Sequence, residues 1–114
     1  MIVSFKFIRV DGTVTTHSDE LRGEPGNWYK SLHDIFAEFF GDDIEMEHVN
    51  VWHKGKYTDM FVDETGVLKG LPINPKATEI YRANVLAHEV NPPNPNDMPP
   101  IHGDALLFEQ KVWF

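Results

Sequence analysis

The chain has 114 residues and a formal net charge of −8, a length that predicts one domain, residues 1–114, with a core of moderate size. It has no cysteine, which excludes disulfides, thiolate zinc sites and cysteine nucleophiles. The negative charge argues against a surface that broadly binds nucleic-acid phosphates and favours a basic partner.

No apolar run approaches the roughly 20 residues that a membrane-spanning helix needs. Residues 1–10 alternate between apolar and polar side chains, unlike the apolar stretch of a signal peptide. We therefore expect a soluble protein of the cytoplasm that does not enter a membrane.

The first part of the chain predicts a β-hairpin followed by a loop. Apolar and polar residues alternate over 2–10, which indicates a strand with one buried face. The Asp11-Gly12 pair is a strong hairpin signal. Residues 13–17 then predict a more exposed returning strand, and residues 18–26 a loop.

One core helix is predicted over residues 27–40, because apolar and aromatic side chains recur there at helical spacing. Gly41 follows as the expected C-terminal stop. The buried face of this helix is predicted to hold Leu32, Ile35, Phe36 and Phe39.

Residues 44–53 and 57–62 predict two further strands joined by a turn at 54–56. Turn residues at 63–66 follow. The apolar pair at 67–68 predicts that an apolar segment restarts after this turn.

The last part of the chain predicts a second, short helix over residues 75–87, a stiff proline-rich loop at 91–100 and a final strand at 105–108. The elements together predict an α+β fold. We expect a mostly antiparallel sheet of about five strands, with the core helix on one face and the second helix at an edge.

Four segments carry a family resemblance: FVDETG at 61–66, LPINPKAT at 71–78, Tyr81, and HGDALLF at 102–108. Over residues 60–108 the chain resembles a family of short proteins of tailed phages and bacteria, known as a domain of unknown function. The resemblance implies a phage or phage-like origin and a setting in the host-cell cytoplasm. It implies no activity, cofactor or catalytic residue.

Several of the matching residues have structural roles that their chemistry predicts. Asn74 is expected to cap the second helix, and Pro75 to occupy its first position. Gly66 and Gly103 are expected to adopt the left-handed conformation. We predict that these four residues determine the fold.

The histidines do not predict a metal site. They are His17, His33, His48, His53, His88 and His102. A metal site needs two or three ligands in a fixed local geometry, yet no two histidines have i, i+4 spacing in a predicted helix. His48 and His53 fall on opposite faces of one regular strand. We expect no metal and no cofactor.

Carboxylates at 42–43, 45, 47 and 63–64 leave open the alternative of a small hydrolase-like enzyme that uses carboxylates or histidines. The sequence has no phosphate-binding loop, nucleophile elbow or His-Glu-x-x-His motif. Adjacent acids in turns are usually solvated. We therefore predict that the protein is not an enzyme.

A second alternative is a regulatory nucleic-acid binder that uses the hairpin at 52–57. This hairpin combines Trp52, His53, Lys54, Lys56 and Tyr57, and aromatic and basic residues together can bind single strands. The same residues also suit a hairpin whose aromatics pack on the sheet. The overall charge disfavours direct nucleic-acid binding.

The interval between Lys30 and Lys54 contains no lysine or arginine. Asp34 and Glu38 are like charges at i, i+4 spacing on the predicted helix, which destabilises it. Asp42 and Asp43 follow at its C-terminus, where the helix dipole disfavours negative charge. The acids of this interval predict either a solvated surface or an acidic binding face composed of Asp34, Glu38, Asp42, Asp43, Glu45 and Glu47. We expect this face to bind a host or phage protein that is basic or binds nucleic acid. The oligomeric state is not predicted.

Overall fold

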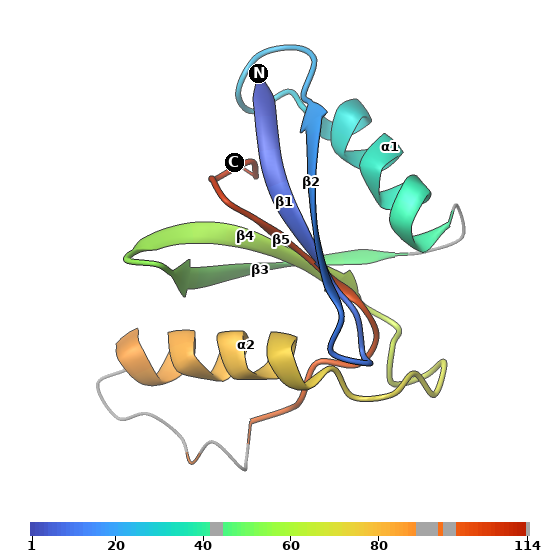
Figure 1. Ribbon diagram of the computed structural model, residues 1–114, viewed down its shortest axis with the longest axis vertical. Coiled ribbons are helices and arrows are strands. Elements are labelled where there is room, and N and C mark those ends of the chain that lie inside the picture. Colours follow the sequence, from blue (N-terminus) through green and yellow to red (C-terminus); the bar gives the residue numbers. More distant parts are fainter. Residues whose placement is uncertain (42–44, 89–93, 95–97, 114) are drawn as a thin grey trace.

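The computed structural model describes residues 1–41, 45–88, 94 and 98–113. These residues form five strands and two helices, which confirms the predicted α+β class (Figure 1). In chain order the elements are β1 (Ile2–Ile8), β2 (Val14–Glu20), α1 (Tyr29–Phe40), β3 (Met46–His53), β4 (Lys56–Asp63), α2 (Pro75–His88) and β5 (Ala105–Phe108).

The five strands form one sheet in the order β2-β1-β5-β4-β3, and all neighbouring strands are antiparallel. The hairpins β1–β2 and β3–β4 are joined by the last strand, since Leu106 of β5 pairs with Phe7 on one side and Phe61 on the other. The edges of the sheet are therefore β2 and β3.

The two helices pack on different faces of this sheet (Figure 1). Successive residues of a strand point to opposite faces, so Phe61 packs in the cluster with α1 while Met60 packs in the cluster with α2. The α2 helix lies against β3, the edge strand. Each large apolar side chain buried in this way contributes roughly 1.5–3 kcal/mol.

Two element boundaries and the burial of one helix residue differ from the sequence prediction. The core helix begins at Tyr29, because Trp28 occupies the N-cap position with its side chain buried. Phe39, near the end of the helix, is half-buried and contacts the ring of His17. Strand β2 continues to Glu20, because its pairing with β1 extends to Ile2.

The predicted apolar segment at 67–68 is wrong. Val67 and Leu68 are 69% and 89% exposed. Backbone hydrogen bonds from Lys69 to Thr65 and from Gly70 to Val67 fold this stretch into successive turns. The two apolar side chains therefore point away from the core.

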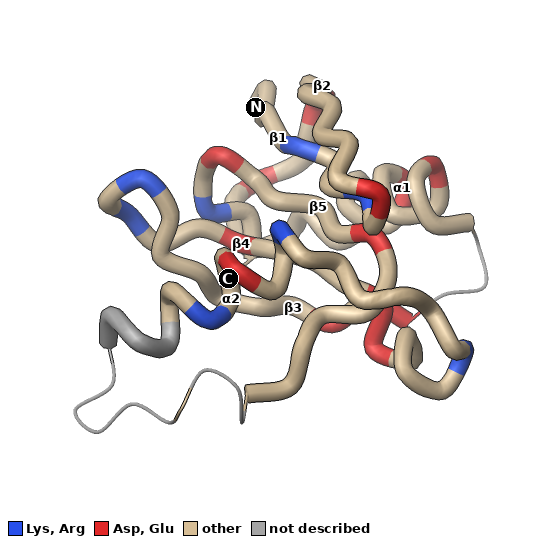
Figure 2. Tube along the Cα trace, turned by 60° about the horizontal axis from the view of Figure 1, so that its bottom comes forward, with Lys and Arg blue, Asp and Glu red and all other residues tan. Residues whose placement is uncertain are grey.

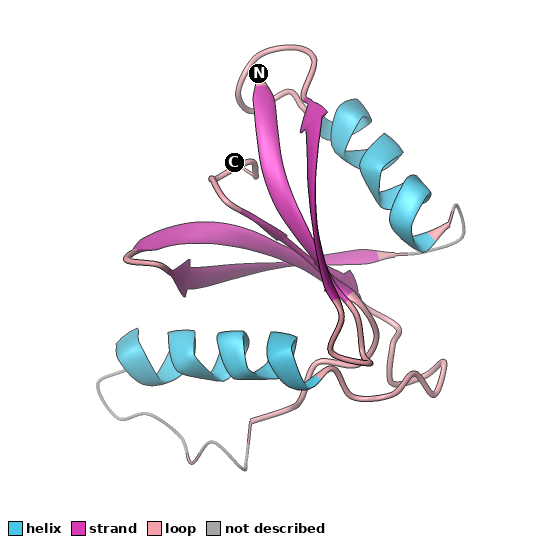
Figure 3. Ribbon diagram, in the orientation of Figure 1, coloured by secondary structure: helices cyan, strands magenta, loops and turns pink. Residues whose placement is uncertain are grey.

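Three loops meet at the beginning of α2, and Asn74 connects them (Figure 3). Its side-chain oxygen accepts from the Ala77 N–H at 3.1 Å, which confirms the predicted cap. Its side-chain nitrogen donates to the carbonyls of Ile8 and Gly103 at 2.9 and 3.0 Å. Asn74 is fully buried, so it holds β1 and the loop before β5 to the helix.

The other predicted structural residues differ in their physical roles. Pro75 opens α2 as predicted. Gly103 has a φ of 88°, which confirms its left-handed conformation. The prediction for Gly66 is wrong, because its φ is not positive. Gly66 is needed for space instead, since a Cβ there would lie 2.7 Å from the carbonyl oxygen of His102.

Candidate functional site

Strand β3 forms one edge of the sheet, and α2 packs against this strand. In an antiparallel pair, backbone groups alternately face the partner strand and face away from it. The Glu64 N–H donates to the Glu45 carbonyl at 2.9 Å, which sets this alternation. Met46, His48, Asn50 and Trp52 therefore turn their backbone N–H and C=O groups away from β4.

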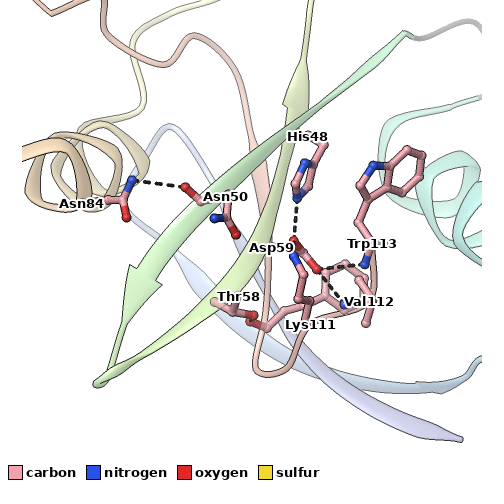
Figure 4. Close-up of polar contacts among 9 residues, drawn as sticks. His48, Asn50, Thr58, Asp59, Asn84, Lys111, Val112 and Trp113 are labelled. Atoms are coloured by element: carbon pink, nitrogen blue, oxygen red, sulfur yellow. Dashed lines mark hydrogen bonds and ion pairs between the residues drawn. The ribbon is translucent and has the colours of Figure 1, made fainter. Parts of the chain in front are cut away.

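Asn84 of α2 occupies half of this edge. Its side-chain oxygen accepts from the Trp52 N–H at 2.8 Å. Its side-chain nitrogen donates to the Asn50 carbonyl at 3.2 Å (Figure 4). One side-chain amide thus makes the two bonds that a neighbouring strand would make. Between described residues, no hydrogen bond reaches the outward backbone groups of Met46 and His48.

A cleft of about 480 Å³ lies beside the uncovered half of this edge. One wall is β3 residues 47–50 together with the end of β4. The opposite wall is Tyr81 of α2 and the loop 99–102, while Gly66 and Val67 close one end. The volume falls within the range of ordinary ligand-binding clefts.

Two exposed carboxylate residues line this cleft, and a third lies next to one of them. Glu47 and Glu64 line it. Glu45 lies opposite Glu64 across the β3–β4 pair, as their 2.9 Å backbone hydrogen bond shows. All three residues are exposed, and no salt bridge between described residues involves them. Like charges directly opposite in a sheet are destabilising, so fold stability does not account for this arrangement.

Asp63 also borders the cleft, but its carboxylate is already bound within the fold. It accepts from Lys69 Nζ at 3.0 Å and from both the N–H and the hydroxyl of Thr65. Burial alone would raise the pKa of Asp63, but these hydrogen bonds outweigh burial and hold the pKa below its ordinary value. This side chain anchors the turn after β4.

His102 also lines the cleft. Its Nδ1 lies 2.8 Å from the carbonyl oxygen of Leu71. A carbonyl only accepts hydrogen bonds, so Nδ1 carries the proton and the neutral ring has its lone pair on Nε2. The chain thus fixes the orientation of this ring next to Gly66.

A second polar cluster lies on the α1 side of the sheet, around Asp59 (Figure 4). Its side chain is fully buried and contacts His48 Nε2 at 2.5 Å. It also accepts from the backbone N–H groups of Val112 and Trp113 at 2.6 and 2.9 Å. Lys111 Nζ is 3.5 Å away. No local sequence pattern predicts this cluster, because it depends on contacts between residues 53 and 54 positions apart.

The predicted acidic face is divided between different parts of the molecule. Asp34 and Glu38 are exposed on α1, and Asp34 lies in a depression with Arg22 and Lys30. Glu47 lies on the α2 side of the sheet with Val49. Acidic segments are spread over several parts of the trace (Figure 2). Asp42, Asp43 and most of the predicted loop at 91–100 lie outside the described residues.

The hairpin proposed for nucleic-acid binding has a two-residue turn, Lys54-Gly55, in which both φ angles are positive. Trp52 and Tyr57 are 39% and 43% exposed and form a T-shaped pair with ring centroids 4.9 Å apart. Burial and then the charge of Lys54 lower the pKa of His53, which keeps its ring neutral at physiological pH.

Among the described residues, no three His, Asp or Glu side chains are arranged to hold a metal ion, and no helix is long and apolar enough to cross a membrane. Comparisons with protein-family models, curated proteins and solved structures gave no match. The resemblance of residues 60–108 to phage and bacterial proteins therefore stays a prediction.

Sequence reasoning considered Glu64 only for the hydrolase alternative, did not group it with the acidic face, and did not identify Tyr81 as a member of the site. A signal for Glu64 was present, since pairing the predicted strands 44–53 and 57–62 extends to place residue 64 beside residue 45. No local signal could place Tyr81 in the same cleft as Glu47, because that placement depends on where α2 packs.

Proposed function

We propose that this protein acts by binding a partner protein, and that the cleft beside β3 receives a basic segment of that partner. The observation that carries the proposal is a cleft of about 480 Å³ lined by the exposed residues Glu47 and Glu64, with exposed Glu45 paired to Glu64. The family resemblance supports a phage-type accessory protein that acts in the host-cell cytoplasm on a host or phage protein.

Charge and shape both support a lysine or arginine side chain as the group that is bound. Glu47 and Glu64 supply carboxylates on the cleft wall, and Tyr81 supplies an aromatic ring on the opposite wall. Carboxylates pair with ammonium and guanidinium groups, and aromatic faces attract the same cations. The acidic chain also speeds the encounter with a basic partner, an effect that salt screens.

The burial of the other acids supports binding over hydrolysis. Asp59 is fully buried and Asp63 is 4% exposed, and both carboxylates hold backbone N–H groups of the fold. A hydrolase needs two carboxylates in reach of a substrate and a water molecule. The carboxylates of Asp59 and Asp63 are committed to these bonds within the fold, which favours binding by the exposed glutamates over hydrolysis by the buried aspartates.

The proposal is tested by capturing partners from host lysate on immobilised protein at low and high salt. The variant Glu47→Gln with Glu64→Gln removes the cleft charges, and Asp34→Asn with Glu38→Gln removes the same number of charges from α1. We expect the first variant to lose a salt-sensitive partner that the second retains. If both variants retain the partner equally, the cleft carboxylates do not bind it. If only the second variant loses the partner, the binding surface lies on α1.

A further inference from the structure

We infer that the bound segment is extended and adds to the edge of β3 as a sixth strand, with a lysine or arginine side chain in the cleft. This inference rests on the proposed function, since it concerns the same site. It follows from the hydrogen-bonding state of the β3 edge.

Asn84 shows what the edge of β3 accepts. Its side-chain amide pairs with the Trp52 N–H and the Asn50 carbonyl at 2.8 and 3.2 Å, the donor and acceptor positions that a peptide backbone would use. The outward groups of Met46 and His48 repeat this geometry further along the same strand. Described residues supply no hydrogen bond to them. Among the described residues, the edge thus has a hydrogen-bond partner at one half and none at the half beside the cleft.

Strand geometry then determines where a side chain of the added segment points. Side chains of neighbouring strands lie side by side on the same face of a sheet. A residue that adds next to Glu47 therefore points to the α2 face, where the cleft lies between β3 and Tyr81. Its side chain enters beside Glu47 and Glu64, and charge complementarity selects lysine or arginine for that position.

The part of the edge without a partner among the described residues is short, so backbone pairing alone would bind a segment weakly. Met46 and His48 offer two N–H and two C=O groups before Asn84 closes the edge at Asn50. Few backbone hydrogen bonds give little net affinity, because each replaces a bond to water. The contact with Glu47 and Glu64 supplies the remaining affinity and selects basic segments over other extended chains.

The test uses a short synthetic peptide of alternating lysine and valine, with free backbone amides. Two matched peptides carry N-methyl groups on alternate amides, one on each edge of the extended chain. In a strand, only one of those edges faces β3. We expect one methylated peptide to bind like the parent and the other to bind at least about tenfold more weakly. Equal binding of all three peptides would overturn strand addition.

Amide hydrogen exchange provides a second readout on the same complex. Peptide binding should slow exchange at the N–H groups of Met46 and His48, while the Trp52 N–H, already bonded to Asn84, serves as an internal control. Protection of Met46 and His48 without peptide, growing with protein concentration, would assign the edge to a second copy of the chain and overturn the inference.

The same measurements separate this inference from the proposed function. Peptide binding that weakens about tenfold in Glu47→Gln with Glu64→Gln, yet leaves exchange at Met46 and His48 unchanged, would overturn strand addition and keep the acidic cleft. If the peptide does not bind, or if Glu47→Gln with Glu64→Gln leaves its affinity unchanged, both the strand-addition inference and the proposed function would be overturned. The variant Asp34→Asn with Glu38→Gln controls for non-specific attraction of a basic peptide to an acidic protein. This variant should bind the peptide as tightly as the wild type does.

Discussion

The carboxylate of Asp59 accepts a 2.6 Å hydrogen bond from the backbone N–H of Val112, 53 residues later in the chain. The same oxygen accepts from the Trp113 N–H, and the ring of Trp113 stacks on His48, which contacts the other oxygen. One buried side chain of β4 thereby fixes the C-terminal segment against the sheet (Figure 4). The β3–β4 hairpin and its edge depend on this support from the α1 side.

Replacing Asp59 by alanine should destabilise the protein strongly. The substitution leaves the Val112 and Trp113 N–H groups without their acceptor, and each buried donor left unsatisfied costs roughly 1–3 kcal/mol. We expect a loss of about 3 kcal/mol in denaturant unfolding, together with a change in tryptophan fluorescence. The exposed Asp34→Ala change is the control, with an effect within about 0.5 kcal/mol. Equal stability of both variants would contradict the Asp59 cluster.

Asn74→Ala should cost more than the removal of a helix cap. Loss of a cap costs about 1 kcal/mol. The buried carbonyls of Ile8 and Gly103 would also lose their donor, adding roughly 1–3 kcal/mol. Thermal or denaturant unfolding measures the sum. Asn74→Ser keeps a capping oxygen and should recover the cap contribution alone. If alanine costs no more than serine, the cap makes no contribution to stability.

Substitutions in α1 should destabilise the protein more at its buried residues than at its half-buried ones. Phe36 is 8% exposed and contacts Phe61 at 4.7 Å between centroids, so Phe36→Ala should cost roughly 3–5 kcal/mol. Phe39 is half-buried against His17, and Phe39→Ala should cost clearly less. A reversed order in measured unfolding free energies would show that the helix faces the sheet in another orientation.

The pH dependence of stability should report the turn anchored by Asp63. Its pKa is lowered in the folded state, so its stabilising contribution is present above the unfolded-state pKa of about 3.9 and disappears as pH falls through the lower folded value. The stability difference between wild type and Asp63→Asn should therefore be constant above about pH 5 and shrink below about pH 4. A difference that grows on acidification would mean that burial, which raises the pKa, outweighs the hydrogen bonds from Lys69 and Thr65.

Local sequence patterns predicted most of the elements but not how they assemble. Alternation and turn residues located the strands, and the Asn74-Pro75 pair located the start of α2, because these signals act within a few residues. The position of β5 between β1 and β4 arises from pairings about 45 to 100 residues apart. The bonds of Asn74 to Ile8 and of Asp59 to Val112 are equally distant.

The acidic interval shows why the site was harder to predict than the fold. Charge along the chain drew attention to Glu45 and Glu47 but grouped them with Asp34 and Glu38, which lie on α1. Proximity in sequence does not determine which face of a sheet a side chain occupies. The alternation of side chains along the strand does. The strand register pairs Glu64 with Glu45, and the packing of α2 places Tyr81 in the cleft that Glu47 lines.

The central claim is that carboxylates of the β3 cleft bind a basic segment. Its most direct test is the association rate constant of the alternating lysine–valine peptide at rising salt, measured for wild type, Glu47→Gln with Glu64→Gln, and Asp34→Asn with Glu38→Gln. Exposed charges act mainly on encounter and are screened within about 10 Å at 0.1 M salt. We predict that the cleft variant associates more slowly at low salt and loses most of its salt dependence, while the α1 variant follows the wild type. Equal rates and equal salt dependence for wild type and the cleft variant would contradict the claim.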